Sequence, residues 1–299
     1  MRKQAGTPSS GGGGAGAIHR LMAVYAVLSG AALLFPHRTG VWPLLALVHV
    51  LAALAGMGVA PFASLFRWLV RRWPRASAWL ADWYPLLLIP LLYAELPALN
   101  TAVHAGAYFD DTIMGWEAAL FGGQPSRAWA AALPFLPLSE VLHASYLSYY
   151  LLIYGPPVML YVMAKRAEFR AAAFALMLTF FIHYLFFIYF PVQGPRYLFP
   201  APGGRIADGF FYGLAHFLLE AGSSQGAAFP SSHVGVAAAQ AWIAWRWLPR
   251  AAPWITLLGV GLALGAVYGG FHYLTDVLAG ALLGLIIAVT GLRLLARMT

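Results

Sequence analysis

Two short segments decide how this chain folds: FPSSH at residues 229–233 and GGFHYLTD at residues 269–276. Two apolar runs lie between them, and RWLPR at residues 246–250 separates the runs. Pro230–Leu248 would span about 29 Å at about 1.5 Å per helical residue, which is one bilayer crossing. The next run, Ala252–Tyr268, is long enough to cross back.

The histidines of the two segments are therefore expected at one membrane face. His233 begins the first crossing and His272 follows the second. Asp276 comes four residues after His272, so it lies on the same side of a helix and one turn further along. The sequence thus predicts that two imidazoles and one carboxylate meet at one place.

The composition predicts an all-α polytopic membrane protein. Of the 299 residues, 61% are hydrophobic and 9% are charged, and the mean hydropathy is +0.72. A soluble domain of this length does not show such values. The formal net charge of +8 is therefore interpreted as membrane topology, not as a sign of a nucleic-acid partner. The chain has no cysteine, which excludes disulfides and thiolate metal sites.

The apolar runs predict a helical bundle of about eight transmembrane helices. Pro61 leaves open whether the second run is one span or a kinked pair. The expected spans are Leu21–Phe35, Val41 to about Val70, Asp82–Asn100, Ser139–Met163, Ala171–Phe190, Pro230–Leu248, Ala252–Tyr268 and His272 to about Leu295.

Three regions follow from these spans. Residues 1–17 contain a Gly/Ser tract and are expected to form a disordered tail. Residues 18–75 form an N-terminal two-helix addition, and residues 76–299 form the catalytic core. Within the core, residues 101–137 and 191–229 are mixed in character and are expected to lie at the membrane interface.

The placement of the cationic residues predicts the topology. With eight spans and a cytoplasmic tail, fourteen of the 18 Lys and Arg residues are inside, and four are outside: Arg38, Arg127, Arg196 and Arg205. This is a strong positive-inside bias. It predicts a multi-pass protein of the inner or plasma membrane with cytoplasmic termini, and a site that faces the periplasm or the extracytoplasmic space.

The start of the sixth span is suited to bind phosphate. Pro230 followed by Ser231 and Ser232 is typical of a helix start with a serine cap. The free N–H groups of such a first turn bind anions. Arg196 and Arg205 lie in the preceding loop, and a guanidinium matches phosphate oxygens. We therefore expect Ser231, Ser232, Arg196 and Arg205 to bind a substrate phosphate.

Two imidazoles beside a phosphate suggest that one attacks phosphorus and the other protonates the leaving oxygen. Asp276 would hold His272 in one tautomer, as the carboxylate does in serine-protease triads. His272 is then the nucleophile and His233 the general acid. Water would open the phosphohistidine to give hydrolysis, and a lipid or sugar hydroxyl would give transfer. No cofactor or metal is needed for this chemistry.

The segments PSSH (230–233) and HYLTD (272–276) resemble the second and third signature motifs of the type-2 phosphatidic acid phosphatase superfamily of membrane lipid phosphatases and phosphotransferases. The resemblance covers roughly spans three to eight. LFG (120–122) and GPRY (194–197) look more like the branch that contains inositol phosphorylceramide synthase.

The resemblance implies a six-helix core with the first two spans as an addition. It also implies that the residue matching His272 is the nucleophile, that the residue matching Asp276 supports it, and that the residue matching His233 protonates the leaving group. A phospholipid or polyprenyl phosphate would be the substrate.

The chain departs from the phosphatase pattern at three points. The first motif, Lys followed after six residues by Arg-Pro, is absent, and Arg196 is its nearest analogue. Ala266 stands where the pattern has an Arg six residues before the third-motif His, and Ser232 stands where Gly is commonest. The phosphate cradle must therefore be built differently, which favours the transferase-like branch.

Other polar residues near the outer ends of spans have open roles. Glu95, His104 and His143 are candidates for a head-group pocket, although each also fits a satisfied interfacial residue. Asp110 and Asp111 either cap an interfacial helix or meet a polar head group.

Two rival functions remain. Two His and one Asp also suit a zinc ion with an open position, as in a metal-dependent membrane hydrolase. A non-catalytic lipid transporter or binding protein with a degenerate site is the other rival, because Glu95 and His183 within spans would suit a proton-coupled path.

Overall fold

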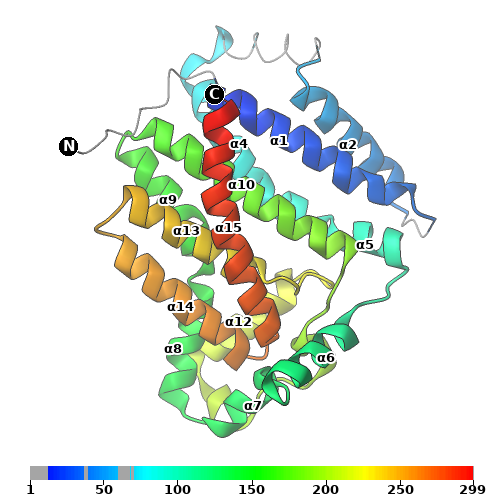
Figure 1. Ribbon diagram of the computed structural model, residues 1–299, viewed down its shortest axis with the longest axis vertical. Coiled ribbons are helices and arrows are strands. Elements are labelled where there is room, and N and C mark those ends of the chain that lie inside the picture. Colours follow the sequence, from blue (N-terminus) through cyan, green and yellow to red (C-terminus); the bar gives the residue numbers. More distant parts are fainter. Residues whose placement is uncertain (1–12, 37–39, 60–67, 69–70, 299) are drawn as a thin grey trace.

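The computed structural model describes residues 13–36, 40–59, 68 and 71–298. Within these residues the chain is helical, and its only β feature is an isolated bridge between Val192 and Ala227. The predicted all-α fold of a membrane helical bundle is confirmed, and Figure 1 shows its helices packed side by side.

The helices follow the chain in a simple order. They are α1 (Gly13–Gly30), η1 (Ala31–Leu34), α2 (Trp42–Gly56), α4 (Pro74–Ala94), α5 (Leu96–His104), α6 (Asp110–Phe121), α7 (Pro125–Ala132), α8 (Leu136–Leu147), α9 (Tyr149–Val162), α10 (Arg166–Tyr189), α11 (Pro195–Leu198), η2 (Gly204–Asp208), α12 (Phe210–Gly222), α13 (Ser232–Trp247), α14 (Ala252–Tyr268) and α15 (Leu274–Met298).

Three helices of the described chain are long and apolar enough to cross a membrane: Gly16–Leu34, α10 and α15. The pair α4 and α5, bent by 46°, is a fourth candidate if it forms one broken span. Helices α2, α9 and α14 are apolar but shorter. Helices therefore occupy most of the described part of the predicted segments, while the count of eight crossings stays a prediction.

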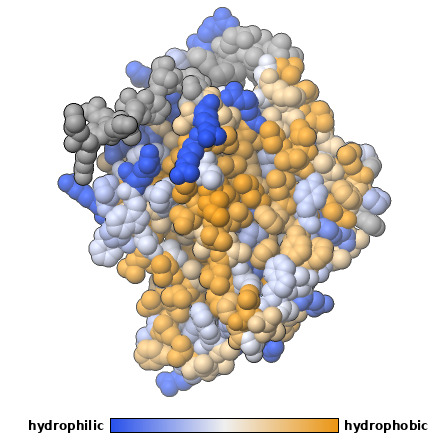
Figure 2. All heavy atoms as spheres, in the orientation of Figure 1, coloured by the Kyte–Doolittle hydropathy of each residue, from blue (hydrophilic) through white to orange (hydrophobic). Residues whose placement is uncertain are grey.

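Apolar side chains cover the flank of the bundle. Figure 2 shows them spread over the face in view, and α15 exposes Leu278, Leu282 and Leu285 on its outer side. Exposed apolar patches of this extent mark contact with another apolar phase. Together with the spanning helices, they identify a membrane protein.

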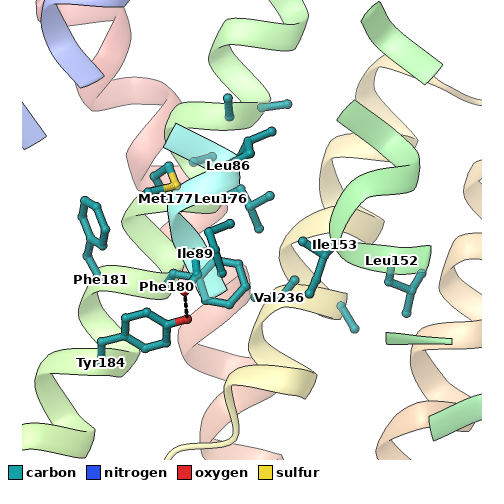
Figure 3. Packing of buried hydrophobic residues seen from close by; sticks show 14 of the residues in the cluster. Leu86, Ile89, Leu152, Ile153, Leu176, Met177, Phe180, Phe181, Tyr184 and Val236 are labelled. Carbon is teal, nitrogen blue, oxygen red and sulfur yellow. Dashed lines mark hydrogen bonds between the residues drawn. The ribbon is translucent and has the colours of Figure 1, made fainter. Parts of the chain in front are cut away.

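Helix α10 forms the centre of the bundle and contacts helices on several sides, among them α1, α4, α5, α9, α13 and α15. After the charged residues at its start it is apolar all round, which is typical of a buried helix. Figure 3 shows Leu176, Met177, Phe180 and Tyr184 pointing into the packing around it, and all four are at most 1% exposed. The Tyr184 hydroxyl also donates to the carbonyl of Ile89 in α4 at 3.3 Å.

Helices α13 and α15 pack most extensively, and glycines make this approach possible. A Cβ atom on Gly284 would overlap the backbone of Gly235, and one on Gly280 would overlap the backbone of Ser231. Gly280 and Gly284 form a GxxxG pair, the pattern that lets membrane helices approach closely. The crossing brings the start of α13 beside the first turn of α15, where the Ser231 N–H donates to the Asp276 carbonyl at 2.9 Å.

The N-terminal region corrects one boundary. Helix α1 begins at Gly13, so residues 13–17, which were expected to belong to the tail, are helical. Ala17 and Ile18 are buried, because α1 packs on α2 and α10. The rest of the expected tail, residues 1–12, lies outside the described residues.

The structure shows a continuous helix only in the first half of the second predicted span. Helix α2 ends at Gly56, and residues 60–67 and 69–70 lie outside the described part. Whether this run is one span or a kinked pair therefore stays open.

The two expected interfacial segments hold short helices. Residues 101–137 contain α6 and α7, and residues 191–229 contain α11, η2 and α12. Figure 1 shows α6, α7 and α12 at the lower end of the bundle, close to the start of α15. These segments thus surround the place where the two histidine motifs end.

Candidate active site

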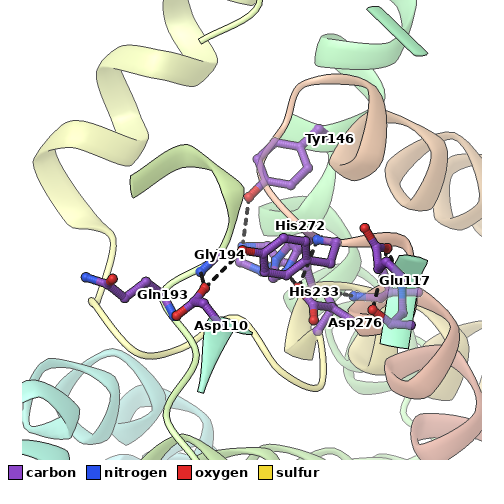
Figure 4. Close-up of polar contacts among 12 residues, drawn as sticks. Asp110, Glu117, Tyr146, Gln193, Gly194, His233, His272 and Asp276 are labelled. Carbon is purple, nitrogen blue, oxygen red and sulfur yellow. Dashed lines mark hydrogen bonds and ion pairs between the residues drawn. The ribbon is translucent and has the colours of Figure 1, made fainter. Parts of the chain in front are cut away.

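The two predicted histidines meet at this end of the bundle. His233 is in the first turn of α13, and His272 is in the turn between α14 and α15. Their ring centroids are 5.5 Å apart at an interplanar angle of 61°, and Figure 4 labels both residues at this place. The two halves of the motif therefore share one site.

Asp276 holds the turn that carries His272. Its Oδ2 lies 3.4 Å from His272 Nδ1 and accepts the Tyr273 N–H at 2.9 Å. Asp276 is fully buried, and its Oδ1 has no hydrogen-bond partner in the described structure. A carboxylate in the first turn of α15 is favoured there because it accepts from free N–H groups. Asp276 therefore orients the His272 ring through Nδ1 and makes no contact with Nε2.

His272 is set up as a neutral base. It is 4% exposed, and burial lowers its pKa to about 4; the Ala228 carbonyl opposes this shift and the positive charge of Arg196 adds to it. An imidazole with this pKa is uncharged at neutral pH. One nitrogen of the neutral ring therefore keeps its lone pair.

His233 is enclosed by aromatic rings. Its ring centroid lies 5.3 Å from that of Tyr146 and 4.1 Å from that of Tyr149. The Tyr146 hydroxyl is 3.5 Å from His233 Nε2, while His233 Nδ1 is buried without a described partner. This wall keeps the ring facing His272 and leaves a nitrogen available for a proton.

The predicted serine cap is present at the start of α13. The Ser231 side chain accepts the Val234 N–H at 3.4 Å, and Ser231 and Ser232 are both buried. The N–H groups of Ser232 and His233 precede the intrahelical hydrogen bonds. They form the kind of helix terminus that binds anions.

The loop that carries Arg196 is tied to the histidine motif. Val192 forms two backbone hydrogen bonds with the residues just before that motif. It accepts from the Ala228 N–H at 2.9 Å and donates to the Gly226 carbonyl at 3.2 Å. Gly194 has φ of +92°, and a Cβ there would lie 3.1 Å from Ala228 Cβ and 3.3 Å from the Phe271 carbonyl oxygen, so a side chain would be strained. The loop thus brings Arg196 close enough for its charge to act on His272.

Ser223 fixes the end of the Arg196 side chain. The guanidinium donates to the Ser223 hydroxyl at 2.7 Å and lies 4.9 Å from the Tyr197 ring centroid. One of its five N–H groups is used in this way, which leaves others for a ligand.

Two carboxylates on α6 hold both halves of the site, and the interpretation of the sequence missed this role. Asp110 accepts the N–H groups of Gln193 and Gly194, each at 2.9 Å, and the Tyr273 hydroxyl at 3.1 Å. It therefore links the arginine loop to the turn that carries His272 (Figure 4).

Glu117 caps α15 from the neighbouring helix. It is fully buried and accepts the Thr275 N–H at 3.1 Å. Asp110 and Glu117 are seven residues apart, so they lie on one face of α6. That spacing is the signal that could have revealed the pair.

A cavity of about 380 Å³ lies beside this site. Arg196 lines it together with Arg127, Phe199, His216, Glu220 and Gly270. Burial, together with the charges of His143 and Arg196, lowers the pKa of His216 to about 4, so the ring is neutral at pH 7. Gly269 and Gly270, at the start of the turn that carries His272, also line the cavity.

Comparison with known proteins agrees with this geometry. A family model described as the PAP2 superfamily matches residues 111–290, a range that includes His233, His272, Asp276 and Arg196. The chain belongs to the PAP2 superfamily. No match was found among curated proteins or among solved structures. Membership in the PAP2 superfamily supports phosphoryl transfer of the phosphatase type.

The PAP2 core gathers some of the predicted pocket residues and not others. His143 is buried, and its ring centroid lies 6.2 Å from that of the cavity residue His216. Glu95 is 3.6 Å from His49 at the packing of α2 on the α4–α5 bend. His104 contacts the Tyr189 carbonyl at 3.1 Å, and Arg205 is exposed in η2. Neither Glu95, His104 nor Arg205 lines the cavity beside Arg196.

Among the residues that the structure describes, no three His, Cys, Asp or Glu side chains are grouped closely enough to hold a metal ion.

Proposed function

We propose that this PAP2 chain is a membrane enzyme that cleaves a lipid-linked phosphate through a phosphohistidine on His272. The phospho group then passes to a hydroxyl acceptor or to water, without a metal. The observation that carries the proposal is the approach of the His233 and His272 rings to 5.5 Å, with Asp276 on the opposite nitrogen of His272.

In the first step His272 Nε2 attacks phosphorus. The N–P bond forms as the P–O bond to the leaving group breaks, and the leaving oxygen takes a proton from His233, which takes up that proton as the phosphate anion binds, because the anion favours the charged ring. Asp276 supports the positive charge that develops on the His272 ring. Arg196 and the first-turn N–H groups of α13 stabilise the phosphate oxygens, whose negative charge is close to them throughout.

In the second step the phosphohistidine is opened. A water or a hydroxyl group gives its proton to His233 and attacks phosphorus, and the P–N bond breaks to restore neutral His272. Water yields free phosphate, and a lipid or sugar hydroxyl yields a new phosphate ester. The side chains needed are the same for both outcomes.

The surroundings of the site favour a lipid substrate. The catalytic turn follows α14 and precedes α15, a helix with an apolar outer face, so a phospholipid or polyprenyl phosphate can remain in the bilayer while its phosphate reaches His272. The bias of fourteen cations against four supports cytoplasmic termini and a site on the periplasmic or extracytoplasmic side.

The arginine loop favours transfer over simple hydrolysis. The phosphate cradle uses Arg196 of the GPRY segment, where the phosphatase pattern has a different first motif. This supports the transferase-like branch as the nearer relative.

Product analysis of the purified protein tests the proposal. Phosphatidate, a polyprenyl diphosphate and a phosphoinositide serve as donors, with and without diacylglycerol or ceramide as acceptor. Free phosphate alone identifies a phosphatase, and a phosphorylated acceptor identifies a transferase. A phosphohistidine is stable in alkali, so a labelled donor followed by an alkaline quench should label the wild-type chain and not His272→Ala.

Two further experiments separate the proposal from its rivals. Loss of activity with a chelator, restored by added zinc, would support the metal-dependent hydrolase. A His272→Ala protein that keeps full function in cells would support the transporter or binding protein.

A further inference from the structure

The cavity beside the catalytic turn contains two arginines from separate segments. Arg196 comes from α11, and Arg127 comes from α7 in the other interfacial segment. The proposed function uses Arg196 and gives Arg127 no task. The inference below rests on that proposed function and concerns what Arg127 binds.

Arg127 is held in place but is not neutralised. Its guanidinium carbon lies 4.3 Å from the ring centroid of Phe199, a cation–π contact that fixes the plane of the group. Within the described chain it has no ion pair and no side-chain hydrogen bond, and Glu220 in the same cavity is not within ion-pair distance. Its five N–H donors are therefore not used by another side chain of the described residues.

The two arginines divide the cavity by their neighbours. Arg196 is the one whose charge acts on His272, so it belongs to the phosphate that His272 attacks. Arg127 sits against Phe199 and lines the cavity with Glu220 and His216. A group bound at Arg127 is therefore a second part of the same ligand, beyond the reacting phosphate.

The charge balance of the cavity favours an anion. Two guanidinium groups face one carboxylate, that of Glu220, and the His216 ring adds no charge at neutral pH. Guanidinium groups bind phosphate oxygens in pairs of parallel hydrogen bonds. We infer that Arg127 forms a second anion site, and that the preferred substrate carries a further anionic group on its head, as a lipid diphosphate or a phosphorylated head group does.

Two matched substrate pairs test this inference with the purified full-length protein. The first pair is a prenyl diphosphate and the monophosphate of the same prenyl chain. The second is a phosphatidylinositol phosphate and phosphatidylinositol with the same acyl chains. For each pair, the ratio of the two kcat/KM values measures the effect of the additional anion.

Arg127→Ala should lower at least one of these ratios about tenfold, which corresponds to about 1.4 kcal/mol of binding. A fall in the first ratio identifies an adjacent phosphate, and a fall in the second identifies a phosphorylated head group. Arg127→Lys should recover part of the ratio, because the charge returns without the planar fork.

Arg246→Ala is the matched control. Arg246 is also exposed and also faces an aromatic ring, with its guanidinium carbon 5.8 Å from the Trp247 centroid, but it lies in the last turn of α13 and does not line the cavity. It should leave both ratios unchanged. If Arg127→Ala leaves both ratios unchanged while the protein remains folded, the inference is wrong.

Failure of the proposed function would look different. An enzyme that is inactive on every lipid and forms no phosphohistidine would refute that function, and the cavity would still be tested by inorganic pyrophosphate and orthophosphate. In the His272→Ala protein, pyrophosphate should bind about tenfold more tightly than orthophosphate, and Arg127→Ala should remove the difference. Equal binding of both anions before and after that change overturns the second anion site.

Discussion

The described part of the chain contains two buried pairs of a histidine and a carboxylate, and one of them lies beside a second histidine. His49 lies 3.6 Å from Glu95 in the N-terminal part of the bundle, and His272 lies 3.4 Å from Asp276 at the catalytic turn. All four residues are at most about one-tenth exposed by their side chains. The pairs look alike in distance and burial, so neither property distinguishes a site.

Their surroundings distinguish them. Both ring nitrogens of His49 contact the bundle itself: Nδ1 is 2.8 Å from the Leu45 carbonyl, and Nε2 is 3.1 Å from the Ser29 hydroxyl. His272 uses Nδ1 for Asp276 and has His233 beside it. The first pair joins helices, as polar groups between membrane helices do. The second lies beside another imidazole and the first turn of α13, a helix terminus of the kind that binds anions.

Removing the histidine of each pair should give the largest contrast. His272→Ala removes the proposed nucleophile and should lower kcat by at least about 10³-fold. His49→Ala should keep near wild-type kcat but lose about 1–3 kcal/mol of stability, because it breaks buried hydrogen bonds. Initial rates and thermal unfolding in the same detergent measure both. A folded His49→Ala protein without activity would contradict the distinction.

Neutralising the carboxylates should give the next largest contrast. Asp276→Asn keeps the size of the side chain but no longer favours the tautomer of His272 with a free Nε2 lone pair, so kcat should fall about 10²-fold or more. Glu95→Gln should change activity little, because Glu95 Oε1 is buried without a hydrogen-bond partner in the described structure. The measurement is kcat for both variants at saturating substrate. Equal losses would show that Asp276 acts only in packing.

The sequence predicted that His233 and His272 would meet, because that inference uses only short-range spacing and helix lengths. Asp276 follows His272 by one helical turn, and one bilayer crossing each way returns His233 to the same face. Ser231 as a cap is equally local. These inferences needed no knowledge of how helices pack.

The parts that were missed depend on packing between distant segments. Asp110 and Glu117 meet the loops at residues 192–194 and 273–275 only after α6 docks at the end of the bundle. Glu95 was expected near the head group, but the bend between α4 and α5 directs it toward α2. Sequence spacing predicts which face of a helix a residue occupies, not which neighbour that face meets.

Glycine positions offer a third contrast. A Cβ on Gly280 would overlap the backbone of Ser231, which cannot yield easily, so Gly280→Ala should shift α13 against α15 and lower kcat about tenfold. A Cβ on Gly30 would lie 3.1 Å from the Cβ of His49, so Gly30→Ala should affect thermal unfolding more than kcat. Comparison of kcat with unfolding temperature checks this. Equal kcat values for the two variants would mean that the crossing does not position the histidines.

The cap from α6 should have a smaller effect that conservative replacement reverses. Glu117→Ala leaves the buried Thr275 N–H without its acceptor and should lower kcat several-fold, with KM less affected, because the loss acts on the catalytic turn. Glu117→Gln keeps an oxygen for that N–H and should recover most of the rate. If the alanine variant changes KM and not kcat, Glu117 acts on substrate binding and not on the turn.

The smallest expected effect is the pH dependence of the catalytic pair itself. The pKa of His272 is about 4 in the folded protein, below its usual value of 6.5, because the ring is buried. The neutral ring that attacks phosphorus is thus fully present above about pH 5 and is lost only as the pH falls through about 4. After correction for ionisation of the substrate, kcat/KM, which reports the free enzyme, should show no acid limb from His272 between pH 7 and 5. An acid limb of the kcat/KM profile near pH 6.5 that disappears in Asp276→Asn would contradict this. It would show that His272 is hydrated like the ring of an exposed histidine, so that burial does not separate the pair from solvent.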